Sequence, residues 1–325
     1  MKIFITGGAG FIGSNLVESL LTLGEIVTVY DNLSSPSYNN IDLFMTRKNY
    51  SFIKGDVCDF DSLETAIKGH DIVVHLAAQL EVTKSYTNSI YDLNINLIGT
   101  INVIKACQNN KISRLINASS ACVYGVTSGT PSKETDAMNP NWEYGISKLA
   151  AEKYIQISGL DYTSLRFSIV FGRHEWYGRV LPIFVKRAIE GNDLVVFGDG
   201  NQIRDYIHVY DVVEFILECI RNPNTINKAY NVSSANGTSI NDLAKLVASK
   251  FDGIKIIYDN VEEGSVSNIV IGRERLKNEL PCLLLDNTLA KTDTKWVPIH
   301  SIHDSINEYI DWARGLAELW TNFKV

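Results

Sequence analysis

The sequence predicts an α/β fold with a doubly wound parallel sheet, followed by a smaller C-terminal domain. Three observations favour this fold. Strand-like and helix-like segments alternate through the first half of the chain, and a glycine-rich turn joins the first strand to the first helix. The length of 325 residues, with 45% hydrophobic content, is enough for about two domains.

In the first half, short apolar or β-branched runs are typical of buried strands, and apolar residues at a period of 3.6 are typical of helices. The expected strands are residues 2–6, 26–30, 51–54, 72–76, 114–118 and 162–167. The expected helices are residues 14–23, 62–68, 90–109 and 143–158. Strands that alternate with helices are joined by right-handed crossovers, so we expect one parallel sheet covered on both faces.

The second half is less regular. Helices are expected at residues 181–190, 212–221, 240–250 and 302–312, and extended segments at 194–197, 205–209 and 254–258. The stretch 259–278 is polar and is expected to be rich in loops. We place the domain boundary at residue 170, giving domains 1–170 and 171–325, with a segment near 205–212 returning to the first.

Composition excludes several classes of protein. The net charge is -7, from 30 Lys+Arg against 37 Asp+Glu, so a broad cationic face for nucleic acid is not expected. No apolar stretch approaches the ~20 residues of a membrane-spanning helix. The five cysteines form no CxxC pair and the six histidines have no metal-ligand spacing. We therefore expect reduced cysteines, no metal, no membrane contact and a cytoplasmic location.

The glycine-rich turn occupies residues 6–13. Gly8, Gly10 and Gly13 satisfy GxGxxG, and Gly7, Gly10 and Gly13 satisfy GxxGxxG. Between a strand and a helix, this pattern is typical of the Rossmann-type dinucleotide fold, where backbone N–H groups meet a diphosphate. Asp31 ends the second strand, and a carboxylate there accepts hydrogen bonds from ribose hydroxyls while repelling a 2′-phosphate. The pattern predicts NAD rather than NADP; otherwise the glycines only pack a helix and Asp31 only caps a turn.

A YxxxK spacing lies on the expected helix 143–158. Positions i and i+4 share a helix face, so the Tyr144 phenol and the Lys148 ammonium can point into one site. A free tyrosine titrates near ~10, and nearby positive charge favours the phenolate that a general base requires. The pair is thus a candidate catalytic pair, and the alternative is two surface residues.

Further short motifs accompany these two. They are Asp31-Asn32-Leu33, Gly55-Asp56-Val57, His75-Leu76-Ala77-Ala78, Asn96 with Gly99-Thr100, Ser119-Ser120-Ala121-Cys122-Val123-Tyr124-Gly125, Gly198-Asp199-Gly200, Arg204-Asp205-Tyr206-Ile207-His208-Val209 and Trp296-Val297-Pro298. With these motifs the chain resembles the extended short-chain dehydrogenase/reductases over nearly its whole length. More narrowly, it resembles nucleotide-sugar epimerases of the UDP-glucose 4-epimerase type.

The resemblance implies a role for each matching residue. The catalytic residues would be Tyr144, Lys148 and Ser120. Besides Tyr144 and Lys148, the cofactor-binding residues would be Gly7, Gly10, Phe11, Ile12, Gly13, Asp31, Asn32, Asp56, Val57, Leu76, Ala77, Ala78 and Asn96. The substrate-binding residues would be Ser120, Arg179, Phe197, Arg204 and Arg275.

For several of these residues a second interpretation stays open. Ser120 could be a strand-end hydroxyl bonded to backbone, and Phe197 could belong to the core. Arg204 could be a surface charge paired with Asp205 or Asp199. Arg273 competes with Arg275 for the role of second phosphate contact.

Departures from the family pattern discriminate between reactions. The related 4,6-dehydratases and decarboxylases carry an acid one or two residues after the catalytic Ser/Thr, where this chain has Ala121 and Cys122. Ser-Ala-Cys also resembles GDP-mannose 3,5-epimerases, whose cysteine works beside a lysine. That lysine would fall near Val180, which cannot move a proton, so we interpret Cys122 as structural.

Three further departures concern the sugar. Ile169 and Arg179 replace two asparagines of the family, and Arg179 could supply another phosphate contact. Leu283 falls near a gate position where the family has a large tyrosine, so a 2-acetamido sugar could fit.

We expect reversible epimerisation at C4 of a nucleotide-linked hexose through a 4-keto sugar, with retained NAD and no net redox change. The hexose would be of the UDP-glucose/UDP-galactose or UDP-N-acetylglucosamine type. The alternatives are conversion at C2 or C3/C5, net reduction, and a non-catalytic NAD-binding sensor. The resemblance also implies a homodimer through a pair of helices that includes the YxxxK helix.

Overall fold

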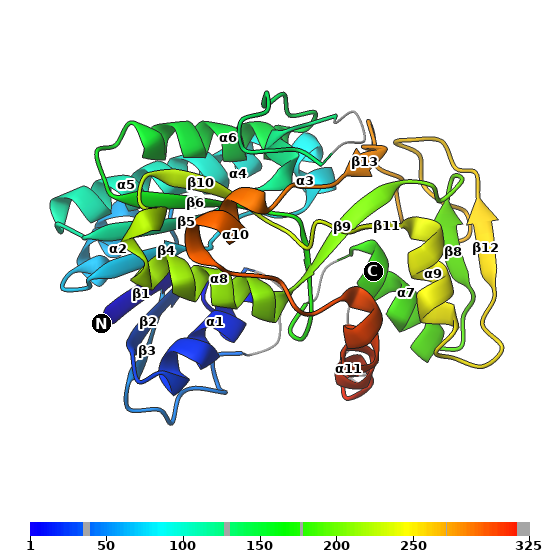
Figure 1. The fold of residues 1–325 in the computed structure, drawn as a ribbon, viewed down its shortest axis with the longest axis horizontal. Helices are drawn as coiled ribbons and strands as arrows, with labels where there is room; N and C mark the ends of the chain where they lie inside the picture. The colour runs from blue at the N-terminus through cyan, green and yellow to red at the C-terminus, as the bar shows by residue number, and fades with distance from the viewer. Residues whose placement is uncertain (35–39, 127–130, 176–177, 271, 317–325) are drawn as a thin grey trace.

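The computed structural model describes residues 1–34, 40–126, 131–175, 178–270 and 272–316. Its larger part is a seven-stranded sheet in the order β10-β6-β5-β4-β1-β2-β3, in which every neighbouring pair is parallel (Figure 1). The strands are β1 (Lys2–Thr6), β2 (Ile26–Asp31), β3 (Tyr50–Lys54), β4 (Ile72–His75), β5 (Arg114–Ser120), β6 (Tyr162–Phe167) and β10 (Lys228–Val232).

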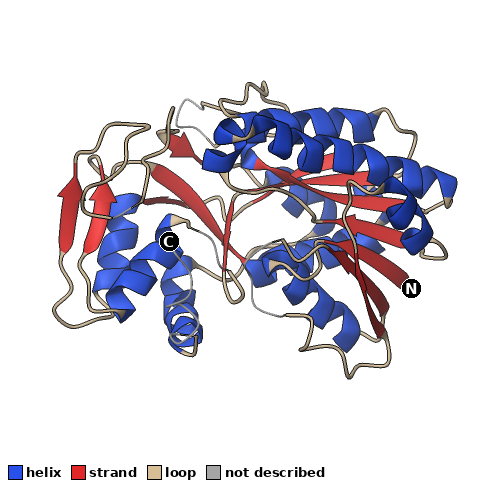
Figure 2. Cartoon of the chain, turned by 180° about the vertical axis from the view of Figure 1, so that it is seen from behind, coloured by secondary structure: helices blue, strands red, loops and turns tan. Residues whose placement is uncertain are grey.

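Helices cover both faces of this sheet (Figure 2). On one face α1 (Phe11–Thr22) packs against α8 (Val209–Arg221), and α10 (Thr288–Thr294) packs beside β10. The other face carries α2 (Phe60–Ile67), α5 (Gly99–Asn109) and α6 (Glu143–Gln156). Alternation along β1 explains the two cores, because Ile3 and Ile5 enter the first while Phe4 enters the second.

The smaller part contains two short sheets. The first has the order β11-β9-β13 with β7 also on β9, and the second pairs β12 with β8. These strands are β7 (Ile169–Phe171), β8 (Leu194–Phe197), β9 (Ile203–His208), β11 (Gly237–Ser239), β12 (Ile256–Asp259) and β13 (Cys282–Leu283). The accompanying helices are α7 (Val180–Ile189), α9 (Ile240–Ala248) and α11 (Ile302–Arg314), which share one apolar core.

The α/β fold and the parallel sheet are confirmed, but several elements differ from the sequence prediction, and β7, β11, β13 and α10 have no expected counterpart. The helix expected at 90–109 is divided into α4 (Ser89–Leu93), a π-helical turn η1 (Asn94–Ile98) and α5, and α3 (Val82–Thr87) precedes it. The seventh strand, β10, comes from the second half of the chain, and the sequence predicted no strand at residues 228–232. The boundary at residue 170 stays a prediction; the segment that rejoins the first sheet runs from α8 through β10.

Candidate active site

The glycine turn forms a close-fitting cradle between β1 and α1. A Cβ atom on Gly7 would lie 2.6 Å from the backbone nitrogen of Ala77, and Gly7 has a φ of +72°. A Cβ atom on Gly13 would lie 2.3 Å from the carbonyl oxygen of Gly7. Only glycine fits at these positions, so the turn packs closely against the loop after β4 and against itself. This packing sets the N-terminus of α1, whose free backbone N–H groups can meet a diphosphate.

Two carboxylates stand at the carboxyl ends of neighbouring strands. Asp31, at the end of β2, accepts hydrogen bonds from the backbone N–H groups of Ala9 (3.0 Å) and Leu33 (2.8 Å). Burial raises the pKa of Asp31, and these two hydrogen bonds oppose the rise. Asp56 accepts a hydrogen bond from Asn32 (2.9 Å). Asp31 thus ties the glycine turn to the strand end where a ribose would lie, and a carboxylate retains lone pairs for that purpose.

Asn96 lies in the π-helical turn η1 and joins it to the loop after β4. Its side-chain oxygen accepts from the backbone N–H of Gln79 (2.9 Å), and its amide donates to the carbonyl of Gln79 (3.1 Å) and to Asp92 (3.0 Å). Ser147, on α6, donates to Asp92 (2.7 Å). The loop that begins with Leu76, Ala77 and Ala78 is therefore held by buried hydrogen bonds from Gln79 to Asn96 on η1 and to Asp92 on α4, and Ser147 joins Asp92 to α6.

The predicted catalytic side chains come together at the carboxyl end of β5. Ser120, the last residue of β5, lies beside the Tyr144 phenol and lowers its pKa, and the Ser120 hydroxyl accepts a hydrogen bond from the backbone N–H of Cys122 (3.1 Å). Burial raises the pKa of Tyr144 and the neighbouring Cys122 raises it further, whereas the charge of Arg179 and the Ser120 hydrogen bond lower it. The protein's own groups thus keep the phenol protonated at neutral pH, and ionisation depends on additional positive charge.

Lys148 lies one helical turn beyond Tyr144 and is buried. Its ammonium donates to the carbonyl of Ala118 on β5 (2.9 Å). Burial lowers the pKa of Lys148 to about 8, and the carboxylates of Asp92 and Glu152 oppose that effect. His75 remains neutral near it, because burial lowers the pKa of His75 to about 3.

Cys122 is half-buried beside this group. Burial raises the pKa of its thiol, and the Ser120 hydrogen bond and the charges of Arg179 and Arg204 only partly oppose the rise. Arg179 precedes α7 as its N-cap and so brings the smaller part of the molecule to Tyr144. Val180 follows at the first position of α7, so the lysine of the 3,5-epimerase pattern has no counterpart there.

The two arginines predicted to bind phosphate share one carboxylate. Arg204, on β9, donates to Glu279 (3.2 Å) and to the carbonyl of Leu280 (2.7 Å), and Arg275 donates to Glu279 (3.4 Å). Arg204 therefore pairs with Glu279 rather than with Asp205 or Asp199. Arg273 differs from Arg275, because its guanidinium donates to the carbonyl of Gly178.

The other predicted substrate residues lie around these arginines. Phe197 is half-buried at the end of β8, and a Cβ atom on the adjacent Gly198 would lie 2.9 Å from the Arg275 guanidinium. Leu283 is buried on β13 and stands opposite Arg204 in the register of β9. Ile169 begins β7 and is half-buried. Two residues of the site could not be predicted from the sequence. Glu279 ends a polar stretch without periodicity, so nothing indicated its contact with the two arginines. Asn40 lies in a loop and donates to the carbonyl of Ala9 (3.0 Å).

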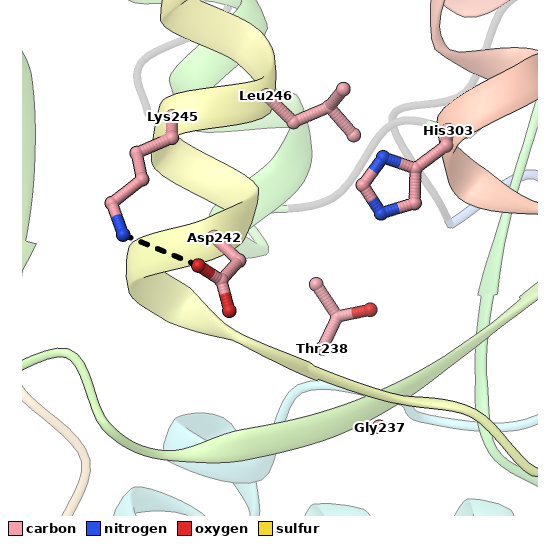
Figure 3. A pocket seen from close by; sticks show the side chains of 6 residues that line it. All are labelled: Gly237, Thr238, Asp242, Lys245, Leu246 and His303. Atoms are coloured by element: carbon pink, nitrogen blue, oxygen red, sulfur yellow. Dashed lines mark hydrogen bonds and ion pairs between the residues drawn. The ribbon is translucent and has the colours of Figure 1, made fainter.

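A surface hollow elsewhere contains none of these residues. It has a volume of about 380 Å³ and lies where α9 faces α11, lined by Gly237, Thr238, Asp242, Lys245, Leu246 and His303 (Figure 3). Lys245 and Asp242 pair with each other there (3.3 Å). The described residues contain no group of His, Cys, Asp and Glu arranged to hold a metal. Within the same ranges, every helix is too short or too polar to cross a membrane.

Comparison with known proteins gives the family. A chain from Methanocaldococcus jannaschii, whose name proposes a UDP-glucose 4-epimerase, is 32% identical over 96% of this chain and 98% of its own length. A dTDP-glucose 4,6-dehydratase from Actinoplanes is 36% identical over 65% of this chain and 70% of its own length. The crystal structure of UDP-glucose 4-epimerase with UDP-glucose from Thermotoga maritima is 30% identical with a TM-score of 0.86, covering 97% and 99% of the two chains.

The family model described as "NAD dependent epimerase/dehydratase family" matches residues 3–233, which is more than half of the sequence. The family depends on NAD, as the glycine turn and Asp31 predicted, and the resemblance to extended short-chain dehydrogenase/reductases is confirmed. The relatives named above divide between epimerases and a dehydratase. From its glycine cradle to its Tyr144–Lys148 pair, this chain belongs to the NAD-dependent epimerase/dehydratase family of enzymes.

Proposed function

We propose that this enzyme epimerises a nucleotide-linked hexose at C4, through a 4-keto sugar and without net redox change. The observation that carries the proposal is the buried group of Tyr144, Ser120 and Lys148 at the carboxyl end of β5, combined with the absence of a carboxylate at positions 121 and 122. The coarser function, an NAD-dependent conversion of a nucleotide sugar, follows from the family and the named relatives.

The residues that fit NAD are those of the cradle and the two strand ends. Gly7, Gly10 and Gly13 form the tight turn before α1, whose backbone N–H groups can bind a diphosphate, and Asp31 offers a carboxylate to a ribose. When bound, NAD supplies the hydride acceptor and donor of such a conversion. Lys148 already donates one hydrogen bond to Ala118, and its remaining two N–H groups can hold a ribose hydroxyl.

The proton is handled by the chain's own residues. Tyr144 as phenolate takes the proton of the C4 hydroxyl and returns it when the sugar is reduced again, while Ser120 hydrogen-bonds the reacting oxygen. The charge of Arg179 lowers the pKa of Tyr144, and Lys148 brings a second cation to the site. Burial outweighs these effects, so the phenol would ionise only when further positive charge, such as that of the NAD pyridinium ring, is brought beside it.

Epimerisation also requires the sugar to turn while the nucleotide stays in place. Arg204 and Arg275 lie together around Glu279, so two planar guanidinium groups are available for a diphosphate. Anchoring the diphosphate on the smaller part of the molecule leaves the hexose free to present either face of C4 to the same acceptor.

A 4,6-dehydration, which oxidises C4 and eliminates water across C5 and C6, is the second candidate, because a relative with that name is 36% identical. Eliminating water requires an acid that protonates the leaving hydroxyl. Ala121 and Cys122 occupy the two positions where the dehydratase pattern has this acid, and burial raises the pKa of the Cys122 thiol. A thiol with a raised pKa is a poor proton donor to a hydroxyl, and this favours epimerisation.

A homodimer is part of the proposal. Apolar side chains are exposed on α4, η1 and α6, which pack together (Figure 1). The most exposed are Ile90 (67%), Ile146 (54%) and Ile157 (80%). An apolar surface of this kind on monomeric proteins is uncommon, and pairing with the same surface of a second copy would bury it.

A product assay tests the proposed function. The purified protein is incubated separately with UDP-glucose, UDP-N-acetylglucosamine, GDP-mannose and CDP-sugars, and the products are identified by NMR and mass spectrometry. We expect a C4 epimer of equal mass from at least one of them without added NADH. A product lighter by one water would indicate the dehydratase, and stoichiometric consumption of NADH would indicate a reductase.

A further inference from the structure

A third residue of α6 shares the buried face of the Tyr144–Lys148 pair. Tyr144, Lys148 and Glu152 follow one another at intervals of four, so they lie on one side of the helix. Each lies against a different residue of β5: Tyr144 is beside Ser120, which lowers its pKa, Lys148 donates to the Ala118 carbonyl, and Glu152 accepts from the Ser119 hydroxyl. The β5 partners are three consecutive residues.

Glu152 is itself held by a second buried charge. Arg166, on β6, donates to Glu152 through Nη2 (2.8 Å) and through Nε (3.1 Å to the nearer oxygen). The two side chains are only 5% and 7% exposed. A fork of this geometry fixes both partners, and removing either one would leave a buried charge uncompensated.

The contact continues beyond β6. Arg166 also donates to the Tyr124 hydroxyl (2.8 Å), which donates to Asn231 on β10 (2.7 Å). Glu134 accepts from the backbone N–H of Asn231 (2.8 Å). The helix with the catalytic pair is thereby connected to the seventh strand, which returns from the second half of the chain.

We propose that Glu152, held by Arg166, is a positioning residue of the Tyr144–Lys148 pair that fixes α6 on β5 and supplies a negative charge to Lys148. The inference rests on the proposed function, in which Tyr144 is the base and Lys148 its cationic partner.

Electrostatics supports the same conclusion. The charged or titratable groups around Lys148 are Asp92 on α4, Glu152 and Tyr144 on α6, His75 on β4, and Arg166 behind Glu152. Burial disfavours the Lys148 ammonium, and the two carboxylates favour it. Replacing Glu152 by a neutral residue removes one of these carboxylates and leaves Arg166 unpaired, so both changes lower the pKa of Lys148.

The test is the pH profile of kcat for the Glu152→Gln variant. Glutamine keeps an oxygen for Ser119 and Arg166 but has no charge. Activity that requires the ammonium is lost as pH rises through the Lys148 pKa, so the alkaline limb of Glu152→Gln should move to lower pH by about 1 unit. The matched control is Glu214→Gln, which removes an exposed carboxylate from α8 and should leave the profile unchanged.

Two further measurements keep the inference falsifiable. Glu152→Asp keeps the charge but withdraws it from Ser119 and Arg166, so kcat should fall about 10-fold with an unmoved alkaline limb. If Glu152→Gln does not fold, a wild-type kcat in Glu152→Asp overturns the inference. An unmoved limb in a folded Glu152→Gln variant overturns it as well, because a purely structural residue would lower stability without moving the limb.

The role of Glu152 can also be tested independently of the proposed function. If the wild-type protein converts no sugar nucleotide, the Lys148 pKa is measured without substrate, from ¹³C-labelled lysine Cε shifts assigned with Lys148→Arg. A lower pKa in Glu152→Gln than in wild type would then support the role of Glu152, and equal values would overturn it.

Discussion

Tyr144 is buried in a site that disfavours its ionised form, although the proposed reaction requires that form. Burial raises its pKa, while Ser120 and the charge of Arg179 lower it. In a buried site, nearby charges act strongly on a phenol. The pKa of Tyr144 therefore changes with each cation that is brought beside it, and the phenol can be protonated in one state and ionised in another. This setting is consistent with the proposed role of Tyr144 as a general base whose pKa depends on neighbouring cations.

Replacing Tyr144 by phenylalanine removes the hydroxyl and leaves the ring. We expect kcat to fall at least about 100-fold with little change in the KM of the sugar nucleotide, because the proton acceptor acts in the chemical step. Steady-state kinetics would check this, and retained NAD after gel filtration would control for an intact cofactor site. Unchanged turnover would favour the non-catalytic sensor.

The pKa of Lys148 predicts how the activity of the wild-type enzyme depends on pH. Its pKa of about 8 means that the ammonium is present below that pH and is lost above it. The kcat profile should therefore fall on the alkaline side near pH 8. In Lys148→Arg the guanidinium stays charged, so the remaining activity, although lower, should show no alkaline limb in this range.

At the scale of elements, glycine geometry decides how closely α1 approaches the strand ends. Gly7 combines a positive φ with a Cβ position that is occupied by the backbone of Ala77. Gly24, after α1, has a similar φ of +81° but open space around its Cβ position. These two positions separate the cost of backbone conformation from the cost of a clash.

Gly24→Ala should therefore cost only the left-handed conformation, about 1–2 kcal/mol of unfolding free energy. Gly7→Ala adds the clash with the loop after β4, so it should be more destabilising and should also release NAD. Thermal unfolding with and without NAD measures both effects. Equal losses in the two variants, with NAD retained in both, would contradict the cradle.

Elements with strong local patterns could be predicted from the sequence. The bounds of β1, β6 and β8 agree with the expected ranges, because short apolar runs between turn residues are local signals. The strand β10 has no such signal, since its place in the sheet depends on pairing with β6 some 60 residues earlier in the chain. The π-helical turn was missed because a helical period does not reveal one extra residue in a turn.

The site divides in the same way. The residues of the glycine turn are close to one another in sequence, and so are those of the YxxxK pair. The spacing within each motif was therefore enough to suggest its chemistry. The Arg204–Glu279–Arg275 group joins residues whose partners depend on the fold, and Glu279 had no local pattern. Glu152 could have been found, because it continues the interval of four from Tyr144 through Lys148.

At the scale of the whole molecule, the smaller part is fastened to the helix of the glycine turn. Arg173, after β7, pairs with Glu18 and donates to Asn15 on α1 (3.1 Å). His174 shares a hydrogen bond with Ser14 (2.8 Å). The two halves are thus tied together beside the candidate site, where Arg179 of the smaller part lies close enough to Tyr144 to lower its pKa.

The anchoring arginines are predicted to affect binding more than chemistry. Arg275→Gln should raise the KM of the sugar nucleotide about 10-fold or more with a smaller change in kcat, because a charge-assisted contact to phosphate is lost. Arg273→Gln is the control, since Arg273 donates to Gly178 instead of to Glu279. Steady-state kinetics on both variants separates them, and the reverse order of effects would make Arg273 the phosphate contact.

If the protein is a homodimer, a substitution that disrupts the interface should halve its mass in solution. Ile146→Glu places a charge in the exposed apolar surface of α6 and should give a monomer. Leu23→Glu, at the end of α1, is the control, because Leu23 is 48% exposed on the opposite side of the sheet. Light scattering after gel filtration would measure both. A wild-type protein that is already monomeric would contradict the dimer.

The most direct test of the account follows the hydrogen on C4. A sugar nucleotide that gives a C4 epimer is prepared with deuterium at C4 and converted in ordinary water without added NADH. If the reaction removes a hydride from C4 and returns it to the other face, the product retains deuterium at C4 and forms more slowly than from unlabelled substrate. Deuterium that is lost to water or found on another carbon would contradict epimerisation through a 4-keto sugar.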